Sequence, residues 1–419
     1  MNSGFRFSFL SILILLIGLG TMAITILSPR DNSIGEDKLF EEVQLNLIAD
    51  NVSRVLTAII LLLSGFRILA AIQKSKISSG KSGILFSYFI FFFLATFTTA
   101  FLAKNTSFSI QWLYVPTVLT AVYVTRPMPS VSLISLSKFI LLIYIYGSLL
   151  AAVFASEMAL VSNYESVIPG VTTRLFGVSS HANQLGPLVV SFLVMEFANP
   201  MRSKLRLIHL TAATAVFIWA QSKTSWGFAL LVSLYFVNNK IESTLFSQSS
   251  SRGYYKKFIQ IVLGLVGIVV IYAMVAGLDN VVLSGAAGGV ETLTGRTAIW
   301  AITLNAWASD PLFGYGLSLW DIDFRSKYGM LYVGHAHNQF IHTLGSSGLV
   351  GLTGLLIYIS ALAKRAFKIA KINSVPLMLL GLTIVGSLSE TPLTNIGLFN
   401  GYFFLHLLMF AQLRSILQK

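Results

Sequence analysis

Long apolar runs alternate with short polar connections along nearly the whole chain. A run of about 20 apolar residues crosses the ~30 Å hydrocarbon core of a bilayer as one α-helix. We therefore predict an all-α fold, a polytopic membrane protein of about twelve transmembrane helices that forms one integral membrane domain over residues 1–419. The predicted spans are 8–28, 52–73, 83–103, 108–125, 132–156, 183–198, 207–221, 225–238, 257–277, 338–363, 375–390 and 398–414.

The longest polar interruption, residues 278–337, is predicted to be an extracytoplasmic loop. Its Gly-Ala-Ala-Gly-Gly stretch at 285–289 is typical of a hinge. Residues 296–309 read as a short helix, which Asp310-Pro311 ends. Its tryptophans favour the membrane interface, so this helix would hold Arg296 at the height of lipid phosphates.

Composition supports the membrane assignment. The chain is 55% hydrophobic and only 11% charged, whereas soluble proteins carry about 25% charged residues. Cysteine is absent, which excludes a disulfide framework, a thiolate nucleophile and a cysteine-ligated metal.

The net charge of +13 follows from membrane topology. If the spans alternate from a cytoplasmic N-terminus, most basic residues fall on the inner side, as the positive-inside rule requires. Both termini are then cytoplasmic, and nucleic acid is not an expected partner. The first span follows Arg6 and lacks a small-x-small cleavage site before Pro29, so it is interpreted as an uncleaved anchor.

Three segments reach the outer face in this topology: 157–182, 221–226 and 278–337. Each carries a cation near a membrane boundary, namely Arg174, Lys223 and Arg296. A single cation at that depth is most simply a snorkelling anchor. Three on one face, against the positive-inside trend, favour a dianionic ligand such as a lipid-linked pyrophosphate, because Arg forks pair with phosphate oxygens.

The histidines gather after the long loop, at His335, His337 and His342. His337 and His342 are five residues apart, which places them on different faces of a helix, so a metal site is not predicted. An imidazole is instead a competent general base near neutral pH, and His337 is the favoured candidate. His209 and His406 lie within spans and are interpreted as hydrogen-bonded core residues.

The order of short motifs resembles a known family. These motifs are Gly295-Arg296-Thr297-x-x-Trp300, Pro311-x-x-Gly314-x-Gly316, His337-Asn338 before a Gly-rich span, the segment 177–186 and the turn 221–224. Together they resemble the O-antigen ligase and polymerase superfamily, nearest its exopolysaccharide-polymerase branch, over roughly residues 174–400. One departure is Ser346-Ser347, where family members commonly show an acid.

The resemblance implies a metal-independent, inverting glycosyltransferase of the GT-C type that needs no cofactor. Its donor would be an undecaprenyl-pyrophosphate-linked glycan on the outer, periplasmic side of the bacterial cytoplasmic membrane, and its acceptor a growing polysaccharide. A chain-length regulator and a flippase of the same pathway would be further partners.

The resemblance also implies roles for individual residues. Arg296 and Lys223 would clamp the pyrophosphate, and His337 would take the acceptor proton. Asn338 would orient the histidine or a sugar. The remaining candidates are His181 and Asn183 on the acceptor side, Glu390 at a position where relatives often carry an acid, and Arg174, which is assigned on charge and position alone.

Three functions compete. A polymerase joining lipid-linked repeat units is favoured. A ligase that moves a finished chain onto lipid A core or another acceptor would share the same site and differ in its acceptor. A polysaccharide transporter or flippase is the third, but transporters keep ionisable groups near mid-span, whereas here the polar residues collect on one face.

Overall fold

The computed structural model describes residues 8–28, 47–73, 83–164, 166, 168–233, 293–331, 333–394 and 397–415. Within these ranges the chain is almost entirely helical. The longer helices are α1 (Phe9–Leu27), α2 (Leu47–Gln73), α3 (Gly83–Phe92), α5 (Tyr114–Val124), α6 (Ser130–Phe154), α8 (Ala182–Ala198), α9 (Arg206–Ala220), α13 (Leu293–Ala308), α15 (Gln339–Ile369), α16 (Val375–Gly386) and α17 (Gly401–Ser415). The shorter ones are the π-helix η2 (Phe93–Phe97), α4 (Thr98–Leu102), the 3-10 helix η3 (Ile110–Leu113), α7 (Ser156–Ala159) and α14 (Ile322–Ser326).

Five helical segments are long and apolar enough to cross a membrane: α1, α2, α6, α15 and the continuous stretch Gly83–Leu102. Four shorter apolar helices accompany them, at Ile110–Val124, Ala182–Ala198, Arg206–Ala220 and Val375–Gly386. The prediction of a helical, multi-pass membrane protein is confirmed by these segments. The total of about twelve spans stays a prediction, and the span predicted at 257–277 lies outside the described residues.

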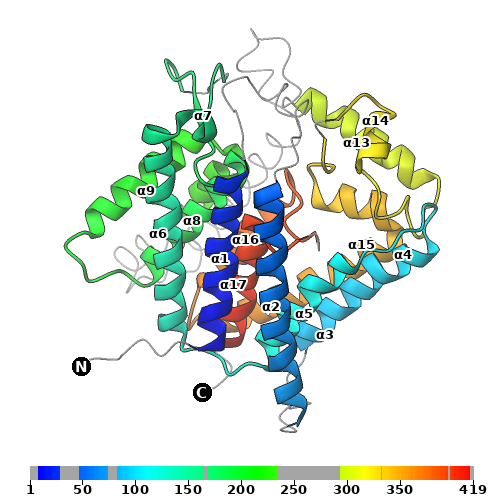
Figure 1. The fold of residues 1–419 in the computed structure, drawn as a ribbon, viewed down its shortest axis with the longest axis horizontal. Coiled ribbons are helices and arrows are strands. Elements are labelled where there is room, and N and C mark those ends of the chain that lie inside the picture. Colours follow the sequence, from blue (N-terminus) through cyan, green and yellow to red (C-terminus); the bar gives the residue numbers. More distant parts are fainter. Residues whose placement is uncertain are drawn as a thin grey trace, which may run out of the picture.

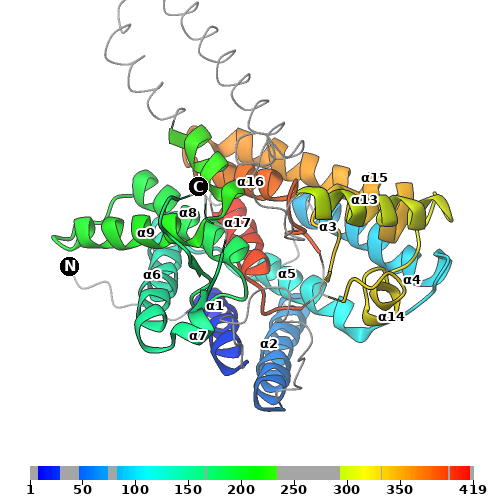
Figure 2. The same ribbon diagram turned by 90° about the horizontal axis from the view of Figure 1, so that it is seen from above.

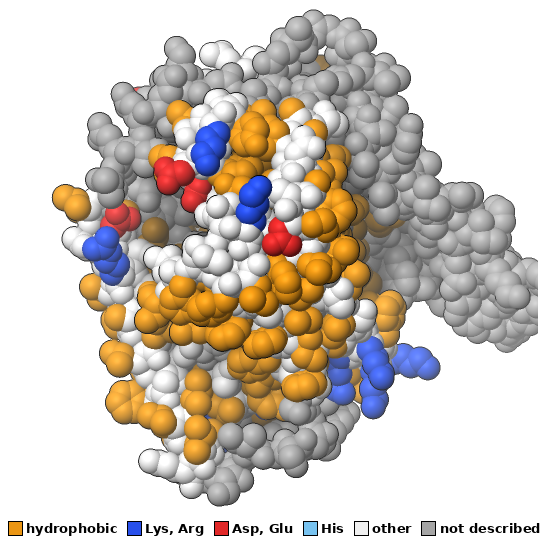
Figure 3. All heavy atoms as spheres, turned by 90° about the vertical axis from the view of Figure 1, so that its right-hand side faces the viewer, with side chains coloured by type: hydrophobic (Ala, Val, Ile, Leu, Met, Phe, Trp, Pro, Cys, Tyr) orange, Lys and Arg blue, Asp and Glu red, His pale blue; other side chains and the backbone are white. Residues whose placement is uncertain are grey.

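The helices form three neighbouring groups (Figures 1 and 2). In the middle α1 packs against α2 and α17, and α16 packs against α17. On one side lie α6, α8 and α9, and on the other α15 with α3, η2 and α13. Figure 3 looks onto the last group: apolar side chains form a broad band across it, acidic side chains and some basic ones lie above the band, and a further group of basic ones lies toward the lower right. That division fits a lipid-facing belt below a polar surface.

One small ribbon departs from the all-α prediction. Strands β1 (Leu160–Val161) and β2 (Arg174–Leu175) pair antiparallel, with Val161 opposite Arg174. The segment had been predicted only as an outer loop. The pairing ties the residues before α8 back to α7, and it buries Arg174 to 4% exposure.

Three charged groups from α6, α8 and α9 form ion pairs inside the helical body. Lys138 on α6 donates to Glu196 on α8 at 2.9 Å, and Arg206 on α9 donates to the other carboxylate oxygen at 2.7 Å. Both Lys138 and Glu196 are buried. An unpaired charge at such a depth would cost several kcal/mol, so this triad fixes the relative position of α6, α8 and α9.

Helix α15 is interrupted at Gly348, whose backbone (φ 64°, ψ −164°) is not helical. A break inside a spanning helix frees backbone groups that lipid cannot satisfy. Here the segment 311–316 takes them up. Leu349 and Val350 donate to the carbonyls of Pro311 and Leu312, and Tyr315 and Gly316 donate to those of Gly345 and Ser346, at 2.8–3.1 Å. The Pro-x-x-Gly-x-Gly motif is therefore a structural insert that completes the broken helix.

We expect Gly348→Ala to destabilise the protein strongly. A Cβ atom there would lie 2.2 Å from the Leu312 carbonyl oxygen, on a residue with positive φ. The conformational cost alone is about 1–3 kcal/mol, and the backbone contact adds to it. The thermal unfolding midpoint in detergent measures the loss. Gly65→Ala on α2 is the matched control, because nothing lies within 4 Å of its added Cβ. Equal midpoints for the two variants would contradict this account.

Candidate active site

The segment between α14 and α15 carries two histidines and is held in place from both sides. The indole Nε1 of Trp300 on α13 donates to the carbonyl of Ala336 at 2.8 Å. Asn338 is the N-cap of α15, and its Oδ1 accepts from the backbone N–H groups of Phe340 and Ile341 at 3.0 and 3.1 Å. The Gly-Arg-Thr-x-x-Trp and His-Asn motifs are thus joined by direct contacts.

His337 lies between these two anchors with a left-handed backbone, φ 46°. Only a few per cent of non-glycine residues adopt this conformation, and an observed case is reason to ask for a function. It points the backbone N–H of His337 at Nδ1 of His335, 3.1 Å away. The two imidazole rings are 4.2 Å apart between centroids.

The carboxylate of this region comes from a different part of the chain, the turn that follows α16. Gln339 holds the turn at two points: its backbone N–H donates to the Ser387 carbonyl, and its Oε1 accepts from the Leu393 N–H, both at 2.8 Å. Glu390 lies between those points and is 6% exposed.

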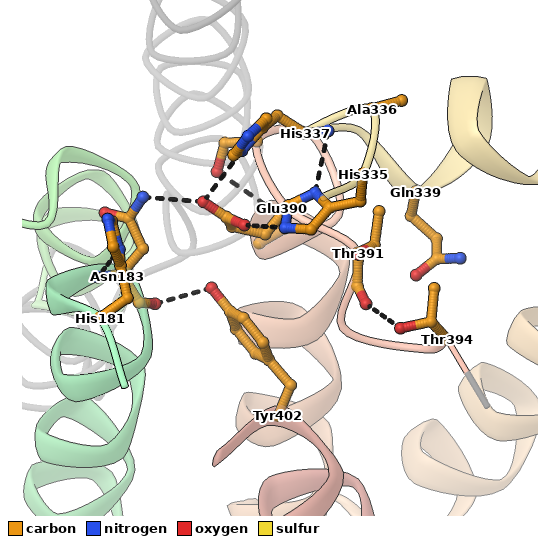
Figure 4. A network of polar contacts seen from close by, with 12 residues as sticks. His181, Asn183, His335, Ala336, His337, Gln339, Glu390, Thr391, Thr394 and Tyr402 are labelled. Carbon is orange, nitrogen blue, oxygen red and sulfur yellow. Dashed lines mark hydrogen bonds and ion pairs between the residues drawn. The ribbon is translucent and has the colours of Figure 1, made fainter. Parts of the chain in front are cut away.

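Glu390 is the centre of a network of polar contacts that we call the Glu390 cluster, made of Asn183, His335, His337 and Glu390 (Figure 4). Asn183 Nδ2 donates to Glu390 Oε1 at 2.7 Å. His337 Nδ1 lies 3.7 Å from the same oxygen, and His335 Nε2 lies 3.5 Å from Oε2. Three segments far apart in sequence therefore meet at one carboxylate.

The electrostatics of the cluster favour an ionised glutamate beside neutral His335. Burial alone raises the pKa of Glu390, but His337, then His335 and Arg296, more than offset it, so its pKa lies well below the ordinary value. Burial lowers the pKa of His335 to about 3, and the neighbouring His337 acts in the same direction. At neutral pH, Glu390 is therefore a carboxylate and His335 is uncharged.

Two predicted residues at the start of α8 have structural partners. His181 is the N-cap of α8, and its Nδ1 accepts from the Asn183 N–H at 3.0 Å. Asn183 is the link to Glu390, so the pair lies at the cluster, and the acceptor-side role that the resemblance implies stays a prediction. Tyr402, which the sequence did not single out, donates its hydroxyl to the Asn183 carbonyl at 2.7 Å.

Arg174 lies next to the cluster but is turned toward protein groups. Its Nη2 donates to Asn183 Oδ1 at 2.8 Å, and its Nε donates to the Ala220 carbonyl at 3.2 Å. Its guanidinium also lies over the Tyr164 ring, 4.8 Å from the centroid. These contacts favour a role for Arg174 in holding Asn183. Charge and position alone had suggested that Arg174 contacts the substrate.

The other two cations are more accessible. Lys223 is exposed at the start of a helical stretch, and the next residue, Thr224, shares a 2.6 Å hydroxyl contact with Ser389, beside Glu390. Arg296 is half-buried on α13, close enough for its charge to act on Glu390. Both predicted phosphate-binding cations thus border the cluster.

His335, Gln339 and Tyr402 belong to the site but were not predicted from the sequence as its members. His335 was considered only as a metal ligand, together with His337 and His342. Gln339 and Tyr402 give no signal by residue type, and only their long-range hydrogen bonds reveal them.

His335, His337 and Glu390 also have the spacing of metal ligands, since one ligand atom from each lies within 4.8 Å of the others. Other observations fit a cation poorly. Asn183 donates to Glu390 Oε1, and the positive charge of Arg296 acts on the same carboxylate. Arg296 would therefore repel a divalent ion bound there.

The fold and the cluster together define a helical multi-pass membrane protein with a histidine–carboxylate site bordered by two cations. Residues 202–356 match the O-antigen ligase family. The chain is also similar to the exopolysaccharide production protein ExoQ of Rhizobium meliloti (strain 1021), with 35% identity over 98 residues. That alignment spans 21% of this chain and only 22% of the relative. The resemblance to the O-antigen ligase and polymerase superfamily is confirmed by these matches.

Proposed function

We propose that this protein is a membrane glycosyltransferase that joins oligosaccharide repeat units carried on undecaprenyl pyrophosphate into exopolysaccharide or O-antigen. The observation that carries the proposal is the Glu390 cluster, in which a histidine that can accept a proton lies beside accessible cations. The match to the O-antigen ligase family covers Lys223, Arg296 and His337, and the relative's printed role in exopolysaccharide production favours this class of product.

In the proposed reaction a hydroxyl of the acceptor sugar attacks the anomeric carbon of the donor from the side opposite the pyrophosphate. The new glycosidic C–O bond forms as the bond to the pyrophosphate breaks, so the configuration at that carbon inverts. His337 takes the hydroxyl proton, and the lipid pyrophosphate leaves with the bonding electrons. Arg296 and Lys223 offset the charge that develops on the leaving group, which allows the reaction to proceed without a metal ion.

We place this site on the outer face of the bacterial cytoplasmic membrane, with both termini in the cytoplasm. The basic residues of the chain are distributed in that sense along the predicted spans. A flippase and a chain-length regulator of the same pathway would supply the donor and set the length of the product.

The deciding experiment is mass spectrometry of lipid-linked glycans in a deletion strain, with and without the wild-type gene. We expect single repeat units to accumulate on undecaprenyl pyrophosphate and to be cleared by the wild type. Accumulation of long chains would instead identify a ligase. If neither accumulates on the outer leaflet, the glycosyltransferase proposal fails. Purified protein in vesicles should also join repeat units in the presence of EDTA, and loss of activity there would refute metal independence.

A further inference from the structure

The two histidines of the Glu390 cluster are not equivalent. In His335, Nδ1 accepts the backbone N–H of His337 and is therefore unprotonated. The proton of the neutral ring must lie on Nε2, which faces Glu390 Oε2 at 3.5 Å. Both nitrogens are thus engaged within the protein, and the low pKa of about 3 agrees with a permanently neutral ring. His335 cannot accept a proton from a substrate without breaking a contact.

His337 has the opposite arrangement. Its Nδ1 is buried, has no hydrogen-bond partner among the described residues, and lies 3.7 Å from Glu390 Oε1. The ring nitrogen Nε2 makes no hydrogen bond with any residue that the structure describes. A proton on Nδ1 would meet the carboxylate directly, and a small movement of the ring would close the gap to a hydrogen bond of about 2.8 Å.

The carboxylate that faces His337 is fixed in place. Asn183 donates to its Oε1 at 2.7 Å. Asn183 is itself held by Arg174, which donates to its side-chain oxygen, and by Tyr402, which donates to its carbonyl. A buried acid that accepts such a bond and is flanked by two histidines has little freedom to rotate away.

We propose that Glu390 positions His337 by accepting its Nδ1–H, so that Nε2 of His337 is the atom that takes the proton of the acceptor hydroxyl. This inference rests on the proposed function. In the transfer step the proton moves from the sugar oxygen to Nε2, and the resulting imidazolium is stabilised by the Glu390 carboxylate. The proton then leaves to water or to the departing pyrophosphate, which restores the neutral ring.

Other charged and titratable groups face the pair from each neighbouring element. They are Arg296 on α13, His335 in the same loop, His342 on α15, His181 at the start of α8 and Tyr402 on α17. Arg296 opposes a positive charge on His337, and the carboxylate favours it. Glu390→Gln removes the negative charge that favours the imidazolium form of His337 and leaves Arg296 in place, so that form becomes less stable.

The test compares wild type with Glu390→Gln, Glu390→Asp and the control Glu157→Gln, whose carboxylate is exposed on α7. For Glu390→Gln we expect kcat to fall about 10²-fold or more, with a smaller change in KM. The acid limb of the pH–rate profile should move down by about one pH unit, because an opposite charge a few Å away is removed. Glu390→Asp keeps the negative charge, so the acid limb of its pH–rate profile should stay near that of the wild type. An unmoved limb in Glu390→Gln would overturn the proposal.

Two further measurements do not depend on activity. Modification by diethyl pyrocarbonate, read by mass spectrometry across pH, should show the same downward shift for His337 in Glu390→Gln, with His335 reacting slowly in wild type. ¹⁵N-histidine NMR of the wild type, assigned with His337→Gln, should report Nδ1–H and an unprotonated Nε2. If His337 instead carries its proton on Nε2, the proposed hydrogen bond from His337 Nδ1–H to Glu390 is refuted, even if every Glu390 variant fails to fold. If the midpoint pH of His337 modification shifts in Glu390→Gln but the wild-type protein transfers no glycan, the proposed function is refuted and the His337–Glu390 interaction is still supported.

Discussion

Replacing His337 by Ala is expected to lower the rate of glycan transfer by about 10²–10⁴-fold, the usual contribution of a general base. His337 is the residue of the cluster with a ring nitrogen left for substrate, since both nitrogens of His335 are engaged. Binding of the lipid-linked donor should change much less, because the charge that holds the pyrophosphate is supplied by Arg296 and Lys223. Single-turnover rates and donor affinity, measured on purified protein in vesicles, separate the two effects.

The control for this variant is His209→Gln. His209 on α9 is hydrogen-bonded to the Tyr146 hydroxyl at 2.7 Å and has no contact with the Glu390 cluster. It should retain wild-type activity, which would show that the loss in His337→Ala is local. His337→Ala with more than a tenth of the wild-type rate would remove His337 as the base.

Arg296→Lys is expected to lower activity by about 10²–10³-fold although the positive charge is retained. A guanidinium presents a fixed fork that matches two phosphate oxygens, whereas an ammonium acts as a point charge on a longer flexible stem. Since the leaving group gains charge in the transition state, the loss should appear mainly in kcat. Rates with the lipid-linked donor, measured as a function of donor concentration, give kcat and KM separately.

Arg202→Lys is the matched control for this substitution, because Arg202 is exposed in the connection between α8 and α9. Its rate should be that of wild type. Full activity in Arg296→Lys would exclude bidentate recognition at that position. Equal losses in both variants would point to an effect of the substitution on the membrane insertion of the chain.

Some residues of the local motifs hold the fold together, and others are placed to act on a substrate. Pro-x-x-Gly-x-Gly completes the interrupted helix α15, since Gly314 and Gly348 allow backbone to meet backbone. Trp300 and Asn338 likewise fix the histidine loop through a hydrogen bond and a helix cap. Arg296, Lys223 and His337 remain as the motif residues with chemistry to offer. A short motif therefore identifies a region of the chain. It does not by itself show which of its residues hold the fold and which contact the substrate.

The Gly-rich run after the histidines shows the same distinction. The sequence predicts this run within the span 338–363, and the observed helix α15 begins at Gln339, before the first of these glycines. However, Gly345 lies against Thr303 of α13, where an added Cβ would come within 2.4 Å of the threonine methyl. The glycine lets α13 approach α15 closely, so the run positions the segment that carries Arg296.

The sequence by itself determined the class of the protein and the position of most of the described apolar helices. Within one apolar run of bilayer length, the backbone N–H and C=O groups can all find partners in the same segment only if it is a helix, since lipid offers no hydrogen bonds to them. The nature of the candidate residues also followed from the sequence, because cations and histidines are costly in such a chain and therefore stand out. His337, Arg296 and Lys223 were found in this way.

The tertiary structure alone decided how these residues are combined. Glu390 is more than 50 positions from His337 and more than 200 from Asn183 along the chain, yet all three meet at one carboxylate. Such contacts depend on how α8, α15 and α16 pack, which periodicity does not encode. The same packing turned Arg174 inward and made His335 different from His337, since a hydrogen bond to one ring nitrogen fixes what the other can do.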